Sequence, residues 1–385
     1  MVHAITKLTE THYEESLQLS EYSFQYKIPE EKRDNRRKQL DNQQVYCIFD
    51  RESLAAKLHL LSLEVWIGDW KVNMGGIAGV ATYPEYRRRG YVKSLITHAL
   101  KEMKDGGQVI SMLHPFEISF YRKFGYELFA YFDKVRLNKK DLMPLNAVSG
   151  NIKRYNRDTF PEELKNVYEE YARQHKGMLN RSQDWWGERS ISDLWVAIYY
   201  DDQQVPKGYI SYEVKKEKMK VEEFVPLNSE ARVGLWNFIC QHDSMIEEAE
   251  LVLNPNEPLT FLLENPRVKV ERLPYFMSRI VDVEGFLKSY LQHIEYEGKL
   301  HLTIKDEFAS WNNATFTIEK QQVKRSQTES GHGIELSINT FTALIFGVYS
   351  PKALTDMGLI QGETAGLAFL DDLLIDSTPF FYDFF

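Results

Sequence analysis

The residue types best suited to binding an anion form a short basic turn, Arg87–Gly90, between a predicted strand and a helix predicted over about 91–104. The N–H groups that open a helix lack partners within it and carry the positive end of its dipole, so they attract anions. Glycine lets the backbone approach a phosphate closely, and arginine adds charge-assisted hydrogen bonds. The alternative is a solvated basic turn without a ligand. The residues that would hold a pyrophosphate are Arg88, Arg89, Gly90, Tyr91, Val92 and Lys93.

Two other kinds of phosphate-binding loop do not fit this chain. No GxxxxGK[ST] segment is present, and Gly75-Gly76 lies before a strand rather than before a helix. The sequence therefore has neither a Walker loop nor a dinucleotide-binding fingerprint. No spacing of histidine, cysteine and carboxylate residues indicates a metal site.

Hydrophobic periodicity around the basic turn predicts strands that alternate with helices, which is typical of an α/β fold. A small-residue strand is expected over 74–82, a buried strand over 108–113 and a further strand over 127–136. After a linker at 138–150, a second unit repeats the same order of elements. From about residue 286, alternating strands and two helices predict a small α+β unit with antiparallel strands.

The order of strand, arginine turn, helix, strand and the segment FYRKFGY at 120–126 resembles the Gcn5-related N-acetyltransferase (GNAT) superfamily. The resemblance implies that the turn grips the pyrophosphate of coenzyme A, with acetyl-CoA as cosubstrate. In this chain Val92 replaces the last small residue of the family's turn, without removing a backbone donor. The resemblance also implies that the strand before the turn splays from its neighbour and pairs with the pantetheine amides through Val80, Ala81 and Thr82.

The same resemblance makes Tyr121 the candidate general acid, which would protonate the departing thiolate. A phenol with a pKa of about 10 can donate to a thiolate whose conjugate acid has a pKa of about 8.5 or higher. Tyr126 is the rival, and its alternative role is that of a core aromatic. Phe116 and Glu117 align with residues that touch the cofactor, although Glu117 could equally be a solvated loop carboxylate.

The last residues are unusual, because five of the six in Phe380–Phe385 are aromatic. Leaving these rings in water would cost a few kcal/mol of lost burial, so the segment is expected to dock on the protein. One interpretation is that the aromatic rings only anchor the tail to the protein through hydrophobic contacts. The other places the terminal carboxylate of Phe385 in an apolar site, where desolvation would raise its pKa from about 3.5 and make it a base.

The three-part layout and this tail together resemble the enhanced intracellular survival (Eis) type of N-acetyltransferase, strongly over 74–128 and more loosely elsewhere. The resemblance implies tandem GNAT-like mixed-sheet domains at 1–148 and 149–285, followed by a sterol-carrier-protein-like α+β domain at 286–385. It also implies a hexamer, and a catalytic base at the carboxylate of Phe385. Some members acetylate aminoglycosides. The second domain has no RxxG turn between Val225 and Ala231, so we expect it to bind no coenzyme A and only to shape the amine pocket.

The composition of the chain indicates which classes of ligand and which cellular location to expect. The formal net charge of the 385 residues is -9, which does not favour nucleic acid and weakly favours a cationic ligand. Cys47 and Cys240 stand far apart in apolar contexts, as expected of buried thiols in a reducing cytosol. The N-terminus has no apolar signal region and no apolar run is long enough to span a bilayer. A cytoplasmic protein without membrane partners is predicted.

These features predict direct transfer of acetyl from acetyl-CoA to a primary amine of a cationic small molecule, such as an aminoglycoside or another polyamine. Acidic residues of the first two domains would line the acceptor cleft. One alternative is the same chemistry on protein lysines or polyamines. Another is a non-catalytic acyl-CoA or lipid carrier that uses the last domain, which is disfavoured if the tail fills the space beside the acyl-transfer site.

Overall fold

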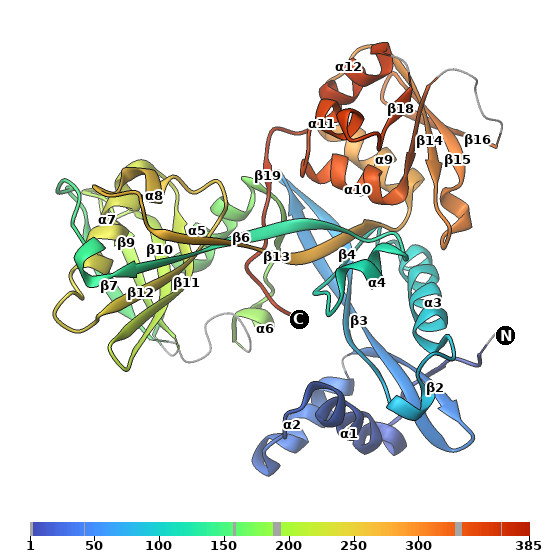
Figure 1. The fold of residues 1–385 in the computed structure, drawn as a ribbon, viewed down its shortest axis with the longest axis horizontal. Coiled ribbons are helices and arrows are strands. Elements are labelled where there is room, and N and C mark those ends of the chain that lie inside the picture. The colour runs from blue at the N-terminus through green and yellow to red at the C-terminus, as the bar shows by residue number, and fades with distance from the viewer. Residues whose placement is uncertain (1–2, 42, 157–158, 188–193, 328–332, 363) are drawn as a thin grey trace.

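The computed structural model describes residues 3–41, 43–156, 159–187, 194–327, 333–362 and 364–385. The elements fall into three units, which occupy separate regions of the molecule (Figure 1). The first unit comprises β1 Thr6–Lys7, α1 Tyr13–Phe24, α2 Glu30–Asp41, β2 Gln44–Asp50, β3 Ser53–Ile67, β4 Trp70–Thr82, α3 Tyr91–Asp105, β5 Ile110–Leu113, α4 Ile118–Arg122 and β6 Glu127–Asn138.

The second unit repeats much of this order. It comprises β7 Asn151–Tyr155, α5 Glu163–Ala172, β8 His175–Leu179, α6 Gln183–Trp185, β9 Trp195–Tyr200, β10 Pro206–Lys215, β11 Lys218–Pro226, α7 Ser229–Cys240, β12 Glu248–Leu253, α8 Leu259–Leu262 and β13 Lys269–Ile280. A tight hairpin connects β10 and β11. Its two loop residues, Lys216 and Glu217, both have positive φ, as a tight two-residue hairpin loop requires.

The third unit comprises α9 Val283–Tyr290, β14 Lys299–Lys305, β15 Ala314–Glu319, β16 Gln322–Ser326, β17 Ile334–Ser337, α10 Ile338–Phe346, α11 Pro351–Asp356, β18 Gln361–Gly362, α12 Thr364–Asp372 and β19 Thr378–Pro379. Its sheet has the order β16-β15-β14-β17-β18. The expectation of antiparallel strands is wrong for one pair, because β14 and β17 run parallel. The connection between them is long enough to return the chain to the same end of the sheet.

One continuous sheet joins the first two units, with the order β1-β2-β3-β4-β5-β13-β6-β12-β11-β10-β9-β7. Strand β13, which the sequence did not predict, lies between β5 and β6 and pairs antiparallel with both. Strand β6 in turn extends into the second unit and pairs with β12. Figure 1 shows these two long strands crossing between the units. The units therefore exchange strands and share one hydrogen-bonded ladder.

The predicted helix over 91–104 is confirmed as α3, and its apolar face is buried. The close approach of α3 to the sheet explains the small residues of β4. A Cβ placed on Gly75 would lie 2.6 Å from the sulfur of Met103, so a larger residue would push the helix away. This packing fixes the start of α3 relative to the end of β4. Among the described residues, no helix is both long and apolar enough to cross a membrane.

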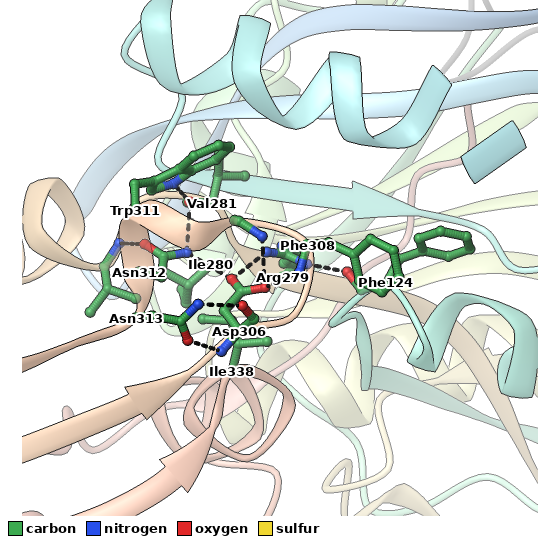
Figure 2. A network of polar contacts seen from close by, with 12 residues as sticks. Phe124, Arg279, Ile280, Val281, Asp306, Phe308, Trp311, Asn312, Asn313 and Ile338 are labelled. Carbon is green, nitrogen blue, oxygen red and sulfur yellow. Dashed lines mark hydrogen bonds and ion pairs between the residues drawn. The ribbon is translucent and has the colours of Figure 1, made fainter. Parts of the chain in front are cut away.

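A buried ion pair ties the third unit to the first (Figure 2). Arg279 of β13 is fully buried and donates to Asp306 and to the backbone oxygen of Phe124. The other oxygen of Asp306 accepts from the N–H groups of Phe308 and Ala309, each at 3.1 Å. Because both carboxylate oxygens are satisfied, the pair can remain charged away from water.

Replacing Asp306 with alanine should leave Arg279 charged, buried and unpaired. We expect a loss of about 3–5 kcal/mol in the free energy of unfolding. Urea denaturation followed by circular dichroism measures it. The matched control is Lys139→Ala, which removes an exposed pair with Glu247 at 3.2 Å and should cost no more than about 1 kcal/mol. Equal losses in the two variants would contradict this account of the junction.

Candidate active site

The free edge of β4 is the first feature of the site. β4 and β5 pair in parallel from Met74 to Ile77, and β4 then continues to Thr82 beyond the end of β5. The register between β4 and β3 shifts near Gly79, which has φ +54°. The hydroxyl of Thr82 is buried without a hydrogen-bond partner. β4 thus extends beyond its neighbour β5, and the backbone of the predicted residues Val80, Ala81 and Thr82 pairs with no other described strand on that side.

The predicted anion cradle at the start of α3 is open. Gly90 is the N-cap with φ +83°, no side chain caps the helix, and a Cβ added to Gly90 would meet nothing within 4 Å. Tyr91 is buried and Val92 half-buried, whereas Lys93 is exposed with its Nζ 5.2 Å from the ring of Phe308. The N–H groups that open α3 are therefore accessible to a ligand.

The two predicted arginines differ in their surroundings. Arg88 has φ +62° and forms no salt bridge within the described ranges. The Arg89 guanidinium lies 3.2 Å from Asp50 and 5.2 Å from the centre of the Tyr86 ring, so it is already oriented. Both side chains are exposed beside the open end of α3.

The corresponding helix of the second unit has a closed N-terminus. The Asn228 side chain caps α7 by accepting from the N–H of Ala231 at 2.8 Å. The free edge of β11 is also occupied, because the Tyr382 hydroxyl bonds to both backbone groups of Phe224, at 3.1 Å and 3.0 Å. These contacts give a physical reason why the second unit should not take a second phosphate-bearing ligand.

Tyr121 lies at the end of α4 and is buried. Its ring contacts those of Phe116 and Phe120, with centroids 5.4 Å and 5.2 Å away. Burial raises the pKa of Tyr121 well above its ordinary value, so the phenol keeps its proton. The Tyr121 hydroxyl has no hydrogen-bond partner among the described residues, whereas that of Tyr126 bonds to Ser111 at 2.7 Å. Tyr126 is thus a core aromatic, and Tyr121 has the free hydroxyl.

The two loop residues before α4 have separate roles. The Glu117 carboxylate caps α4, because it accepts from the N–H of Ser119 at 3.1 Å. Phe116 is 71% exposed, which is high for a large aromatic side chain and leaves its face available to a ligand.

The turn after Tyr121 is held by residues outside the first unit. Asn339 of α10 donates to the backbone oxygens of Arg122 and Tyr126, at 3.0 Å and 2.9 Å. Arg279 donates to the oxygen of Phe124 within the same turn. Three backbone carbonyl groups of this turn therefore accept hydrogen bonds from β13 and the third unit. These bonds restrain the segment that carries Tyr121.

The chain end docks along the second unit and not as a free tail. β19 pairs with β8, and the N–H of Phe380 donates to the oxygen of Lys176 at 3.1 Å. Phe380 and Phe381 are buried. Figure 1 places the C-terminus between the first two units.

Asp383 fixes the last residues through a buried charge cluster. Its carboxylate accepts from Arg181 at 2.9 Å, from Trp185 Nε1 at 2.7 Å and from the Tyr168 hydroxyl at 3.1 Å. Arg181 also pairs with Glu223 of β11. The sequence did not single out these residues, because ordinary charged positions far apart in the chain carry no local signal. Only the shared sheet brings them together.

The docked tail forms one wall of a cavity in the first unit. This cavity has a volume of about 630 Å³ and is lined by Phe384, Phe385, Ala78 and Gly79, among others. A Cβ on Gly76 would lie 2.9 Å from the ring of Phe385, so glycine at this position leaves room for the ring. The structure thus brings Phe385 to the free end of β4.

The expected acidic lining is not found in this cavity: none of the described residues around it is an aspartate or glutamate. Carboxylates line a second cavity of about 560 Å³ on the other side of the tail, where Glu222, Glu223 and Asp383 meet Arg181 and Lys220. Glu223 and Asp383 are already paired with Arg181. The net charge of a whole chain does not determine which charges line one cavity.

Comparison with known proteins assigns the three units. Residues 4–129 and 177–280 each match a family described as an acetyltransferase (GNAT) domain, and 283–382 match a sterol carrier protein domain. The N-acetyltransferase Eis of Mycobacterium tuberculosis is 24% identical over 318 residues, which cover 78% of this chain and 77% of that protein. The chain is a GNAT acetyltransferase related to Eis.

Solved structures support the same fold for this Eis relative. A probable N-acyltransferase of unknown function from Enterococcus faecalis has a TM-score of 0.92 and 26% identity, with complete coverage of both chains. Eis1 from Mycobacterium abscessus has a TM-score of 0.79 and 20% identity, again over both full chains. The α/β (α+β) architecture of two GNAT units and a sterol-carrier-protein-like unit is therefore confirmed.

The stability of the docked tail should depend on pH through His175, which pairs with Thr378 of β19. Burial lowers the pKa of His175 to about 4, although a hydrogen bond to the oxygen of Tyr171 opposes the shift. Between pH 6.5 and about 4, the unfolded chain binds a proton at this site that the folded chain does not. The free energy of unfolding should therefore fall by about 3 kcal/mol as the pH drops through this window, with no contribution above it.

Urea denaturation at several pH values measures this contribution. His175→Gln should show a shallower decline between pH 6.5 and 4 than the unmodified protein. The same decline in both proteins would exclude His175 as the source.

Proposed function

We propose that this GNAT acetyltransferase moves acetyl from acetyl-CoA to a primary amine of a small molecule, by direct attack when both substrates are bound. The observation that carries the proposal is the cavity in which the free end of β4 faces Phe385. The open start of α3 lies just beyond the same strand. A phosphate-bearing ligand and an amine would thus approach the same strand from different sides.

The chain has suitable groups for coenzyme A. The backbone N–H groups of Gly90–Lys93, with Arg88 and Arg89, would hold the pyrophosphate, and Val80–Thr82 would pair with the pantetheine amides. The unpartnered hydroxyl of Thr82 and the uncapped helix support this fit. Phe116 would offer its exposed ring to the cofactor, and Glu117 would hold the loop in place. Acetyl-CoA supplies the acetyl group as a thioester.

Proton transfer is assigned to two groups. The neutral amine forms a bond to the carbonyl carbon while the carbon–sulfur bond breaks. Tyr121 gives its proton to the sulfur, and the carboxylate of Phe385 takes the proton that the amine loses, directly or through water. Return of that proton to Tyr121 completes the cycle. Cys47 and Cys240 are buried with pKa values raised to about 12, so neither is suited to act as a covalent nucleophile.

The remaining expectations concern the acceptor, the role of the third unit, the oligomeric state and the location of the protein. Among the described residues, the support for a cationic acceptor is limited to the carboxylates of the second cavity. Protein lysines are the alternative acceptors, but a cavity narrowed on one side by the tail favours a small molecule. A role of the third unit as a lipid carrier is not favoured, because its tail forms part of this cavity. A hexamer and a cytoplasmic location stay predictions from the resemblance to Eis.

Replacing Tyr121 with phenylalanine tests the assigned acid. We expect kcat to fall by roughly 100-fold, because the thiolate would leave without a proton. The affinity for coenzyme A, measured by calorimetry, should stay nearly unchanged. Thiol release from acetyl-CoA measures the rate.

Tyr126→Phe is the matched control, since it removes the rival hydroxyl and its bond to Ser111 from the same segment. Its kcat should stay within a few-fold of the unmodified enzyme. Full activity of Tyr121→Phe would remove Tyr121 from this role, and absence of coenzyme A binding by the folded protein would overturn the proposed function.

A further inference from the structure

The cavity beside Phe385 contains a lysine without a counter-ion. Lys57 of β3 lines this cavity and is fully buried, yet it forms no ion pair with any described carboxylate. Its ammonium group instead lies 2.6 Å from the oxygen of Ser16, 2.9 Å from its hydroxyl and 2.6 Å from the hydroxyl of Ser20. All three partners are neutral. A buried cation that lacks a charged partner is costly and is often found at functional sites.

The nearby helices supply no hidden partner for Lys57. Glu21 of α1 is buried, but it accepts from the N–H of Ile28 at 2.9 Å and pairs with Arg33 at 3.3 Å. The Glu14 carboxylate likewise forms salt bridges with Arg33 and Arg37. Because these carboxylates are already paired and none lines the cavity, the positive charge on its wall is not balanced by side chains of α1 and α2.

Two more cations lie on the wall formed by α2. Lys32 and Arg36 are exposed and line the same cavity, and neither forms a salt bridge within the described part of the chain. Arg36 donates to the side chain of Gln39 at 3.0 Å, so its guanidinium keeps further donors free. The other polar side chains around the cavity are neutral amides, hydroxyls and an imidazole.

The pKa of Lys57 is shifted in the direction that burial of a cation predicts. Burial lowers its pKa to about 7, and no described carboxylate opposes that shift. An anion bound nearby would favour the charged form of Lys57 and would be attracted by its charge. The only negative charge that we assign to the cavity is the carboxylate of Phe385, whose proposed task is to accept a proton from the amine.

We propose that the acceptor is a primary amine that also bears an anionic group, a carboxylate or a phosphate, that Lys32 and Arg36 bind this group, and that Lys57, whose three donors are taken by Ser16 and Ser20, attracts it by charge alone. The inference rests on the proposed acetyl transfer and specifies its substrate class. The amine end would lie toward Gly79 and Phe385, and the anionic end toward α1 and α2. A polycation would instead place its second charge against three unbalanced cations.

Three amines of matched length test the proposal: 5-aminopentanoate, 5-aminopentanamide and 1,5-diaminopentane, whose far ends are anionic, neutral and cationic. 2-Aminoethyl phosphate compared with ethanolamine tests phosphate in place of carboxylate. Thiol release from acetyl-CoA gives kcat/KM for each amine. We expect the anionic amine of at least one series to exceed its cationic or neutral counterpart by roughly 10- to 100-fold, as charge-assisted hydrogen bonds allow.

Variants identify the residues responsible. Arg36→Gln, on an exposed helix, and Lys57→Met should each lower the ratio of anionic to cationic kcat/KM at least several-fold. Lys38→Gln is the matched control, because Lys38 is an exposed cation of the same helix that does not line the cavity. It should leave the ratio unchanged. If Lys57→Met does not fold, Arg36→Gln alone decides the question.

Calorimetry with the same amines in the presence of coenzyme A separates this inference from the proposed function. Binding of the anionic amine without any thiol release would contradict acetyl transfer while supporting the anion site. Transfer to 1,5-diaminopentane that equals or exceeds transfer to 5-aminopentanoate, or a ratio that Arg36→Gln does not alter, would overturn the inference. Failure of every anionic amine to bind would overturn it as well.

Discussion

The arrangement of this protein depends on one buried cation, Arg181, and the two carboxylates that it holds. Asp383 belongs to the last residues of the chain and Glu223 to β11 of the second unit, so the guanidinium joins the tail to the sheet. It also lies over the ring of Tyr168, 3.9 Å from its centre. Removing one partner from such a cluster leaves an uncompensated buried charge, so the cluster stabilises the docked position of the tail. That position puts Phe385 in the cavity of the first unit.

The two GNAT units differ in the groups that a phosphate-bearing ligand would need. In the first unit the helix after β4 begins at an uncapped glycine. In the second unit the equivalent helix is capped by Asn228, and Tyr382 occupies the free strand edge. The groups that could bind a cofactor in the second unit are satisfied from within the chain. This unit then serves as the dock for the tail, and the third unit supplies the tail and restrains the turn that carries Tyr121.

Much of the first unit could be predicted from its sequence, because its signals are local. The arginine turn, the apolar face of α3 and the segment around Tyr121 all depend on residues close together in the chain. Strand β13 could not be assigned, since its partners β5 and β6 are far from it in sequence and its periodicity is broken by shifts in register near Pro274 and Phe276. The roles of Arg181, Asp383 and Lys57 arise only when distant elements meet. The lack of carboxylate side chains around the cavity beside Phe385 could not be predicted, because net charge describes the whole surface.

The tail brings Phe385 to the proposed site of acetyl transfer, and the turnover number of the protein without this residue tests its role most directly. Because a positioned base typically contributes 10²–10⁴-fold, deleting Phe385 should lower kcat by about 100-fold or more, with coenzyme A affinity and circular dichroism unchanged. Phe385→Ala keeps a carboxylate at this position and should retain far more activity. A deletion variant that is folded and turns over at the full rate would contradict the account.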